Sequence, residues 1–351
     1  MIRRVVPLCV FVAVAATDSV FAWDLPGHMI VTELAVERLP DRIPAWVRDA
    51  ESRERLAYLS GEPDRWRGLK SRILDHHNGP DHYLDVEDLA DYGLALDRLP
   101  RFRGEFIVLL ATERARRPDQ FPRIDRRRDR DYIRYVPGLL PYAIEENYAK
   151  IASCWSTLRT FEAFSDVATP GEIAAARQNV LYSMGILSHF VGDAAQPLHL
   201  TRHHNGWVGE NPRGYTTSDK FHSFTDGGVL ALHDIRFAAL RPRLGEAVSV
   251  DPADPRPSII VLLAESFARV EPLYALEKSG DLKRAPGKRF IEDRLLAAGS
   301  HLAGFWTAAF DAAGMDDFLS RRLRARRRAT AIKPPAEAAP VREPGSEVQK
   351  P

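Results

Sequence analysis

The sequence is poor in cysteine, with only Cys9 and Cys154 among its 351 residues. After loss of an N-terminal segment that contains Cys9, the remaining chain would hold one thiol and could form no internal disulfide. No run of about 18 consecutive apolar residues follows this segment, so no ordinary membrane-spanning helix is expected there. Charge of one sign is also lacking, because 49 Lys and Arg side chains face 48 Asp and Glu. This balance excludes a strongly basic polyanion binder as a description of the whole chain.

The first residues have the pattern of a secretory signal peptide. Arg3 and Arg4 precede an apolar run over 5–16, and small or apolar residues end at Ala22, directly before Trp23. Residues 1–22 are therefore predicted to be a signal peptide, with the protein exported to the periplasm or outside. A short membrane anchor is the alternative. An exported chain without a disulfide must gain its stability from core size or from bound metal.

The C-terminal residues 320–351 combine charge with proline. They hold nine basic and three acidic side chains and five prolines, a composition that cannot bury a core and predicts a disordered tail. The arginine cluster in this tail indicates either a solvated helix end or weak attraction to nucleic acid or anionic lipid. Residues 23–319 retain 38 basic and 44 acidic side chains, and this acidic balance suits the ligation of divalent metal ions.

Helical periodicity dominates the rest of the chain. Apolar residues recur at helical spacing in five segments, and no clean alternating strands joined by hairpin turns are found. The pattern predicts an all-α protein with a single compact multi-helix domain over 23–319. An irregular insertion is expected at about 88–141, where proline and charge mix with short apolar runs. The five helical segments are 28–39, 143–163, 171–195, 257–276 and 288–313.

Histidine and aspartate occur together at helical spacing. His189 and Asp193 are four residues apart, as are His222 and Asp226, so each pair projects from one helix face. His199 lies where the helix that carries His189 should already have ended, and it could still reach a neighbouring site. A single His-x-x-x-Asp pair is typical of an ordinary helix surface. The joint pattern, however, offers the nitrogen and oxygen ligands that zinc prefers.

Two segments carry a more specific pattern. They are Trp23-Asp24-Leu25-Pro26-Gly27-His28, directly after the predicted cleavage site, and His189-Phe190-Val191-Gly192-Asp193-Ala194-Ala195-Gln196-Pro197-Leu198-His199. Together they resemble the secreted three-zinc, single-strand-specific nucleases of the S-one/P-one type, whose relatives are the zinc-dependent bacterial phospholipases C. The resemblance implies an all-α fold with a trinuclear zinc cleft. In that family the mature N-terminal Trp binds zinc through its α-amine and carbonyl, so cleavage after Ala22 would be part of making the site.

Carried over position by position, the resemblance implies three Zn²⁺ ions. The first would be held by Asp64, His82, His189 and Asp193, its close neighbour by Trp23, His28 and the bridging Asp193, and the third by His199, His222 and Asp226. His76 and His77 precede His82 closely and could compete for its role. Neither of them is followed by an aromatic residue and an aspartate, as His82 is.

The resemblance also implies contacts to a substrate. Arg67 would neutralise the charge that develops on a phosphate, and Asp64 would orient the attacking water or take its proton. In His82-Tyr83-Leu84-Asp85, the ring of Tyr83 would stack on an unpaired base and Asp85 would accept hydrogen bonds from that base. For Tyr83, a place in the core is the alternative.

Three hypotheses for the function remain open. The first is a secreted zinc nuclease and 3′-nucleotidase that hydrolyses single-stranded DNA or RNA and 3′-nucleotides to 5′-phosphorylated products, with no covalent protein intermediate. The second is a zinc-dependent phospholipase C, although the gap of twenty-three residues from His199 to His222 and the aspartate at 226 resemble the nuclease branch. The third is a non-catalytic binding protein that zinc stabilises in place of disulfides.

Overall fold

The computed structural model describes residues 23–69, 71–127 and 129–332. The predicted signal peptide at 1–22 and the end of the predicted tail at 333–351 lie outside the described residues. Every regular element in the described part of the chain is a helix, and its strand-like pairing is limited to an isolated antiparallel bridge between Leu84 and Gly138. The prediction of an all-α protein is confirmed. None of the described helices is long and apolar enough to cross a membrane.

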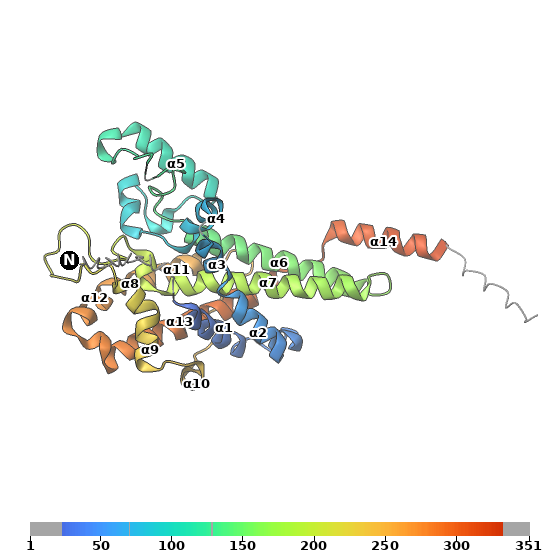
Figure 1. Ribbon diagram of the computed structural model, residues 1–351. Coiled ribbons are helices and arrows are strands. Elements are labelled where there is room, and N and C mark those ends of the chain that lie inside the picture. Colours follow the sequence, from blue (N-terminus) through green and yellow to red (C-terminus); the bar gives the residue numbers. More distant parts are fainter. Residues whose placement is uncertain (1–22, 70, 128, 333–351) are drawn as a thin grey trace, which may run out of the picture.

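Two long antiparallel helices form the centre of the fold (Figure 1). They are α6 (Leu140–Ala163) and α7 (Pro170–Ala195). At the start of α7, the Thr169 hydroxyl accepts a hydrogen bond from the Glu172 amide at 3.1 Å, and the Glu172 carboxylate accepts one from the Thr169 amide at 2.8 Å. Pro197 follows the end of α7 and begins a 3-10 turn, η6 (Pro197–Leu200). The last turns of α7 and η6 therefore lie together at one end of this hairpin.

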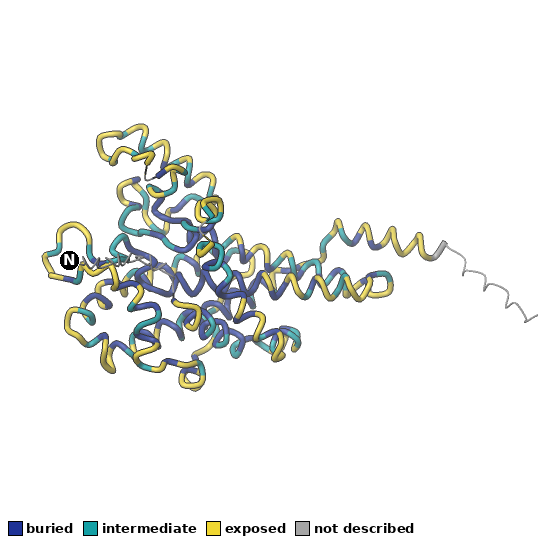
Figure 2. Tube along the Cα trace, in the orientation of Figure 1, coloured by how far each residue is buried: buried dark blue, intermediate teal, exposed yellow. Residues whose placement is uncertain are grey.

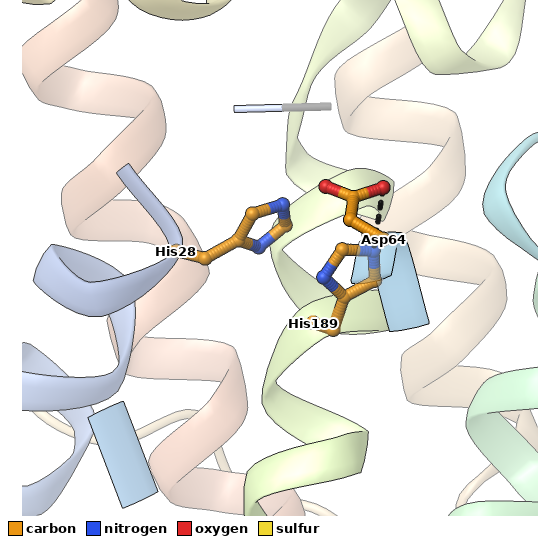
Figure 3. A group of neighbouring side chains, drawn as sticks. All are labelled: His28, Asp64 and His189. Atoms are coloured by element: carbon orange, nitrogen blue, oxygen red, sulfur yellow. Dashed lines mark ion pairs between the residues drawn. The ribbon is translucent and has the colours of Figure 1, made fainter. Parts of the chain in front are cut away.

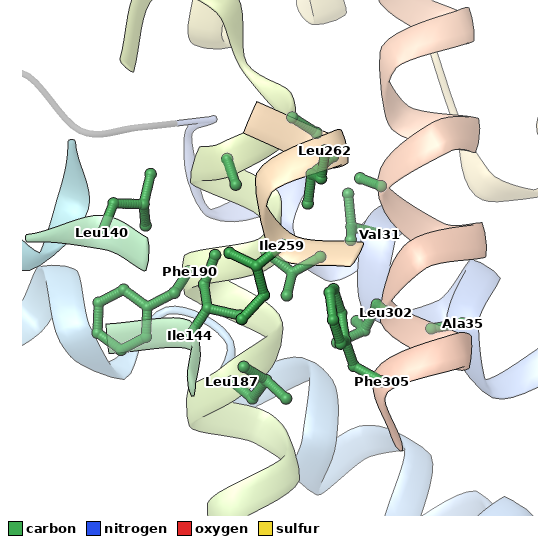
Figure 4. Close-up of a cluster of buried hydrophobic side chains, with 14 of the residues drawn as sticks. Val31, Ala35, Leu140, Ile144, Leu187, Phe190, Ile259, Leu262, Leu302 and Phe305 are labelled. Carbon is green, nitrogen blue, oxygen red and sulfur yellow. The ribbon is translucent and has the colours of Figure 1, made fainter. Parts of the chain in front are cut away.

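Three further helices pack against the hairpin: α1 (Leu25–Glu37), α11 (Arg256–Phe267) and α13 (Ala285–Ala312). The inner faces of the assembly are buried and its outer turns are exposed (Figure 2). Apolar side chains from all five helices meet in the cluster of Figure 4, which includes Val31, Ala35, Leu140, Ile144, Leu187, Phe190, Ile259, Leu262, Leu302 and Phe305. The apolar core that contains this cluster extends from Trp23 to Ala313 along the chain. Burial of apolar area therefore supports a fold whose one described cysteine, Cys154, is free.

The remaining helical elements include several that carry predicted site residues. The α-helices are α2 (Ala50–Leu59), α3 (Glu62–Gly68), α4 (Arg72–Asn78), α5 (Arg103–Arg116), α8 (Phe221–Ser223), α9 (Val229–His233), α10 (Phe237–Leu240), α12 (Val270–Ser279) and α14 (Asp317–Ile332). The 3-10 turns are η1 (Ala45–Arg48), η2 (Gly79–His82), η3 (Val86–Tyr92), η4 (Leu96–Arg98), η5 (Pro118–Gln120), η8 (Arg241–Arg243) and η9 (Asp281–Lys283), and η7 (Phe224–Gly228) is a π-helical turn.

One predicted helix is divided in the structure. The apolar pattern over 257–276 predicts a continuous helix, but α11 ends at Phe267 and α12 begins at Val270. Pro272 explains the break, because proline has no amide hydrogen and its ring clashes with the carbonyl four residues earlier, that of Ala268. In the first turn of a new helix the same proline costs little.

The segment at 88–141 is less irregular than its composition suggests. Most of it is coil and short 3-10 turns, but α5 spans fourteen residues in its middle. The Glu105 carboxylate accepts a hydrogen bond from the Phe102 amide at 3.1 Å and so satisfies a free donor at the start of this helix. Phe106 and Leu110 lie one turn apart on its buried face. Because only these two residues of α5 are buried, the sequence has too short an apolar pattern here to predict the helix.

The prediction of disorder from residue 320 onward is wrong for residues 320–332, which belong to α14. The Asp316 carboxylate caps this helix by accepting a hydrogen bond from the Leu319 amide at 2.8 Å. Its arginines, alanines and leucines are good helix formers, and Leu323 is buried against the body. Composition indicated that this segment builds no core of its own. It gave no sign that the segment docks on another element.

Candidate metal centre

The predicted ligands converge at the end of the α6–α7 hairpin where α7 gives way to η6. Eight of them come from six segments of the chain. These are His28 in α1, Asp64 in α3, His82 in η2, His189 and Asp193 in α7, His199 in η6, and His222 and Asp226 in the continuous segment of α8 and η7. All eight side chains are buried. Three groups of His and Asp within the described residues have ligand atoms close enough to hold a metal ion.

The first group contains His82, His189 and Asp193. Asp193 Oδ2 lies 3.1 Å from His82 Nδ1 and 3.3 Å from His189 Nε2, and these two nitrogens are 3.0 Å apart. Asp64 Oδ1 lies 3.8 Å from each nitrogen. The structure thus brings together the four residues assigned to the first ion. His76 and His77 do not compete with His82, because both are exposed and His76 faces Asp131 at 3.5 Å.

The second group differs from its predicted membership. It joins His28 to Asp64 and His189, whereas the resemblance implied Trp23, His28 and Asp193 (Figure 3). The rings of His28 and His189 stack with centroids 4.0 Å apart, which places His28 beside the first group. His28 Nε2 is also 3.5 Å from Asp193 Oδ1. Asp193 therefore presents one oxygen toward the first group and the other toward His28.

Trp23 lies fully buried beside this group. Its indole N–H donates a hydrogen bond to the carbonyl of Gly192 at 2.9 Å and so attaches the start of the described chain to the residue before Asp193. Gly192 also allows His28 to approach, since a Cβ at this position would lie 2.7 Å from His28 Nδ1. The side chain of Trp23 thus holds the start of α1 against α7, a contact separate from the backbone ligation that the resemblance implies.

The third group contains His199, His222 and Asp226, as predicted. His222 Nε2 lies 3.1 Å from His199 Nε2 and 3.2 Å from Asp226 Oδ2. Asp226 belongs to the π-helical turn η7, a local irregularity that often marks a functional site. The buried Gln196 side chain donates a hydrogen bond to Asp226 Oδ1 and leaves Oδ2 facing the histidines. Sequence reasoning missed this contribution of Gln196, because the contact joins residues thirty positions apart.

Backbone carbonyls orient two of the imidazoles. His189 Nδ1 donates to the carbonyl of Ser60 at 2.7 Å, and His199 Nδ1 donates to the carbonyl of His82 at 2.6 Å. Each bond requires the hydrogen on Nδ1 and leaves the Nε2 lone pair facing the cluster. Metal-binding histidines commonly use such a second hydrogen bond to set the tautomer and ring direction.

Four carboxylate oxygens of the centre have no hydrogen-bond donor among the described residues. Within the described residues, neither oxygen of Asp193 accepts a hydrogen bond, and the same holds for Asp64 Oδ1 and Asp226 Oδ2. Burial raises the pKa of Asp193 and Asp226 well above the usual aspartate value, and it raises the pKa of Asp64 to about 7 although Arg67 opposes the shift. Ionised carboxylates here need a cation, and bound metal would supply it.

The imidazoles of the centre are held neutral. Burial lowers the pKa of His82, His189 and His222 well below the usual histidine value and lowers that of His199 to about 3. A neutral imidazole is the form that binds a metal ion. Nitrogen and oxygen ligands in this combination fit zinc, and the donor set of the three groups passes this chemical test.

A cavity of about 460 Å³ adjoins the first and third groups. The predicted substrate residues Arg67, Tyr83 and Asp85 line it together with three of the ligand histidines. The remaining lining residues were not predicted as site residues, and they are Arg134, Leu198, His204 and Asn205. Arg134 comes from the insertion at 88–141, where no helical pattern ties it to the histidine motifs. This arrangement places two guanidinium groups, an aromatic ring and a carboxyl beside the candidate metal groups.

The chain from His82 to Asp85 is held in place by backbone hydrogen bonds. The Leu84 amide donates to the carbonyl of His199 at 2.9 Å, and the Asp85 amide donates to the carbonyl of Pro137 at 2.6 Å. Tyr83 is half-buried at the cavity rather than inside the core. Asp85 Oδ1 is buried without a hydrogen-bond partner in the described residues, and burial raises the pKa of this carboxyl to about 8. Both side chains are therefore available to a ligand.

Replacing Gly138 by alanine is expected to destabilise the protein and to disturb this wall of the cavity. Gly138 has φ of +121°, and a Cβ there would lie 2.0 Å from the carbonyl oxygen of Tyr83. We expect a loss of about 2 kcal/mol or more in the free energy of unfolding, measured as a fall in Tm. Gly93→Ala is the matched control, because its φ is +70° but nothing lies within 4 Å of the added carbon. Equal effects of the two substitutions would contradict the steric argument.

No family model matches the chain, and no curated protein sequence matches it. We therefore infer the function from the residues of the site and from the chemistry that they can support.

Proposed function

We propose that the protein is a zinc-dependent phosphodiester hydrolase of the S-one/P-one nuclease type, acting on single-stranded DNA or RNA and on 3′-nucleotides. The observation that carries this proposal is the shared cavity, in which Arg67, Tyr83 and Asp85 lie beside two of the three buried His and Asp groups. A phosphate group and a base could occupy such a cavity together. The fold would then be that of the zinc phospholipase C and nuclease superfamily.

The donor atoms described above would hold three Zn²⁺ ions. Asp64, His82, His189 and Asp193 would form one site. His28 would form its neighbour with Asp193, whose Oδ1 lies 3.5 Å from His28 Nε2, and with the backbone of Trp23, as the resemblance implies. The third site would use His199, His222 and Asp226. Bound zinc supplies Lewis-acid chemistry, since it acidifies water and neutralises charge on a phosphate.

The protein's own groups would position the phosphate and move the proton. Arg67 lies 3.6 Å from Asp64 and is partly exposed at the cavity, so its guanidinium can neutralise the charge that develops on a phosphate. Asp64 lies beside Arg67 and the histidines of the first group, so its carboxylate could orient the attacking water or take its proton, as the resemblance implies. No protein nucleophile is required, and the products would carry 5′-phosphates, as the resemblance implies.

Base recognition supports the nuclease over the phospholipase C alternative. Tyr83 is the single Phe, Tyr or Trp side chain among the described residues that line the cavity, and Asp85 lines it as well. One ring with a carboxyl suits the stacking and hydrogen bonding of an unpaired base. A choline headgroup would be expected to favour a cage of several aromatic faces.

A purely structural role for zinc is the third hypothesis. Structural zinc sites are usually closed by four protein ligands. The third group offers three protein ligands and borders the cavity through His199 and His222. An ion held there would keep an open coordination position, which favours catalysis.

Export is part of the proposal. Cleavage after Ala22 would give Trp23 a free α-amine, and the indole of Trp23 already lies beside Asp193 through its hydrogen bond to Gly192. A mature protein that begins at a residue other than Trp23 would contradict the use of this amine as a ligand. Sequencing the N-terminus of the exported protein measures this directly.

A parallel hydrolysis assay tests the proposed function. The mature, zinc-loaded protein is incubated with single-stranded DNA, RNA, 3′-AMP and phosphatidylcholine, each with and without a chelator. Turnover of the nucleic acids and 3′-AMP that stops on chelation is the expected result. Turnover of lipid alone would move the protein to the phospholipases, and nucleic-acid hydrolysis that persists after zinc removal would refute the metal mechanism.

Separate substitutions are expected to distinguish the phosphate and base contacts. Arg67→Ala should lower kcat/KM by about 10²- to 10³-fold on oligonucleotides and also on a phosphodiester without a base, because both share the phosphate. Tyr83→Ala should weaken only the oligonucleotide reaction, by about tenfold or more, since stacking contributes about 1–3 kcal/mol per base. Tyr83→Phe keeps the ring and serves as the control. If Tyr83→Ala slows both substrates equally, Tyr83 is not a base contact.

A further inference from the structure

The arginine-rich helix α14 is not explained by the proposed active site. Of its six arginines, Arg326 and Arg327 attach the helix to the body. Arg326 forms a two-pronged ion pair with Glu172, with N–O distances of 2.8 and 2.9 Å, and Arg327 pairs with Asp166. Arg326 holds the pKa of Glu172 down at about 2, even though the carboxyl is exposed. The helix is therefore tethered to the loop and first turn at the α6–α7 connection.

The other four arginines have no acidic partner among the residues that the structure describes. Within the described part of the chain, no carboxylate lies within ion-pair distance of Arg321, Arg322, Arg324 or Arg328, and all four are exposed. At about 100° per residue, Arg321, Arg324 and Arg328 fall within an arc of about 60° on the side opposite the buried Leu323. Three unpaired guanidinium groups thus form a ridge along about 10 Å of helix.

An exposed aromatic ring lies on the same side of the helix. Phe318 is 63% exposed, and the guanidinium groups of Arg321 and Arg322 lie 6.0 and 5.9 Å from its ring centroid. Basic side chains interleaved with an exposed ring are the combination that binds single-stranded nucleic acid, since phosphates meet the charges and a base can stack on the ring. The helix does not fit a membrane surface as well, because its apolar Leu323 is buried against the body.

We propose that the exposed face of α14, formed by Phe318, Arg321, Arg324 and Arg328, is a docking surface for single-stranded polynucleotide outside the catalytic cavity. This inference rests on the proposed function, because it assumes that the substrate is a nucleic acid. Figure 1 shows α14 at the end of the α6–α7 hairpin away from α8. Seventeen residues of α7 separate Glu172 from His189, a distance of about 25 Å along the helix.

This distance determines which substrates reach both places. About seven nucleotides at the stacked spacing of about 3.4 Å would bridge α14 and the metal centre. Long strands would therefore gain affinity from α14, whereas a trinucleotide or 3′-AMP would not. The helix would act on KM for polymers and leave the turnover of small substrates unchanged.

A binding experiment tests the surface without relying on catalysis. The full mature protein is titrated into a fluorescent strand of about thirty thymidines with phosphorothioate linkages, which resist hydrolysis, and anisotropy is recorded over a range of salt concentrations. The variant carries Arg321→Gln, Arg324→Gln and Arg328→Gln, which keep a good helix former at each position. With about 0.7 counterions released per phosphate contact, the salt slope should fall by about 2. At about 0.1 M salt the affinity should then fall by about 10- to 100-fold.

Charge-matched variants distinguish the contribution of this surface to binding from the contribution of the protein's net charge. Arg55→Gln, Arg236→Gln and Arg289→Gln remove the same charge from exposed positions that do not line the cavity, and they should change the slope by less than about 1. The three lysine substitutions at 321, 324 and 328 should keep nearly the full slope. Circular dichroism confirms that each variant retains its helix content.

Several outcomes would overturn the inference. They are an unchanged thirty-mer affinity in the glutamine variant and an equal loss in the charge-matched control. In a parallel titration with vesicles containing anionic lipid, a loss of affinity for the vesicles without a loss for the thirty-mer would also overturn it. The assay also distinguishes this surface from the proposed function. If the protein binds the thirty-mer through α14 but hydrolyses no nucleic acid, the nuclease proposal is refuted and the docking surface stands. If it hydrolyses nucleic acid and the glutamine variant binds the thirty-mer as well as the wild type does, only the docking surface is refuted.

Discussion

Replacing Asp193 by asparagine is expected to lower phosphodiester hydrolysis by about a thousandfold or more and to reduce the bound zinc from three equivalents to about one. Asp193 is the residue shared by two of the proposed sites. Its Oδ2 lies 3.1 and 3.3 Å from the nitrogens of His82 and His189, and its Oδ1 lies 3.5 Å from His28. Asparagine keeps the shape but removes the negative charge and replaces one oxygen by an amide nitrogen.

The physical reason for the size of this effect is burial. Asp193 is fully buried, and neither of its oxygens accepts a hydrogen bond in the described part of the chain. Asp64 also lies near both groups, but its Oδ1 is 3.8 Å from the nitrogens of His82 and His189, farther than Asp193 Oδ2, and Asp226 belongs to the third group. Two cations side by side would repel each other more strongly without the shared carboxylate.

Zinc content measured by mass spectrometry, together with hydrolysis of a fluorescent single strand, tests this expectation. Asp226→Asn should remove one equivalent instead of two, because Asp226 contacts His222 alone among the ligands, at 3.2 Å. Asp49→Asn is the control, since Asp49 caps α2 at a distance from the centre and asparagine caps equally well. Wild-type zinc content and activity within tenfold of wild type in the Asp193 variant would contradict a bridging role.

The long helices and four of the ligands were predictable from local signals, whereas Trp23, His28, Asp64 and His82 were implied by the resemblance. Four-residue spacing places His189 with Asp193 and His222 with Asp226 whatever the rest of the chain does, and the structure brings both pairs within 3.3 Å. Long amphipathic helices such as α7 are likewise encoded in a short window of sequence. The two histidines that precede His82 lack the aromatic residue and the aspartate that follow it, and the fold leaves both of them exposed.

The remaining features depend on contacts between distant segments. The grouping of His28 with Asp64 and His189 follows from the packing of α1 and α3 on α7, and no spacing rule encodes it. Gln196 supports Asp226 across thirty residues, and Arg134 reaches the cavity from the insertion. For α12 a signal was present, since Pro272 marks the break. For α14 the same arginines that suggested disorder are the groups that dock the helix on Glu172 and Asp166.

Removal of the metal ions is expected to lower the Tm by about 15 °C or more at pH 7.5. A ligand at about 100 times its Kd stabilises the native state by about 2.7 kcal/mol, so three ions contribute about 8 kcal/mol. A domain of this size loses about 2–4 °C of Tm for each kcal/mol. No disulfide is available to limit the loss, because Cys154 is the only cysteine in the described residues and is free.

The pH dependence of this difference has a definite sign. In the metal-free protein burial raises the pKa of Asp64 to about 7 and the pKa of Asp193 and Asp226 well above the usual value. The folded metal-free chain therefore binds protons that the unfolded chain has released, and it loses stability as the pH rises from about 4 through 7. Bound cations favour the ionised carboxylates, so the stability that they add is lost as the pH falls. The imidazoles are neutral in both the metal-free and the metal-loaded folded protein. Their contribution to the pH dependence therefore largely cancels in the difference in stability between these two forms.

The gap in Tm between loaded and chelated protein should accordingly be largest above pH 7 and should narrow toward pH 5. Thermal unfolding followed by circular dichroism, with and without chelator at several pH values, measures it, and re-addition of zinc should restore the original Tm. The Asp193→Asn variant provides the internal comparison. Because it should hold about one ion, its Tm should fall on chelation by only about a third as much as that of the wild type. An unchanged Tm after complete removal of metal would mean that the bound ions add no stability to the native state. The buried carboxylates would then not be the groups that bind them, and the assignment of the three sites would fail.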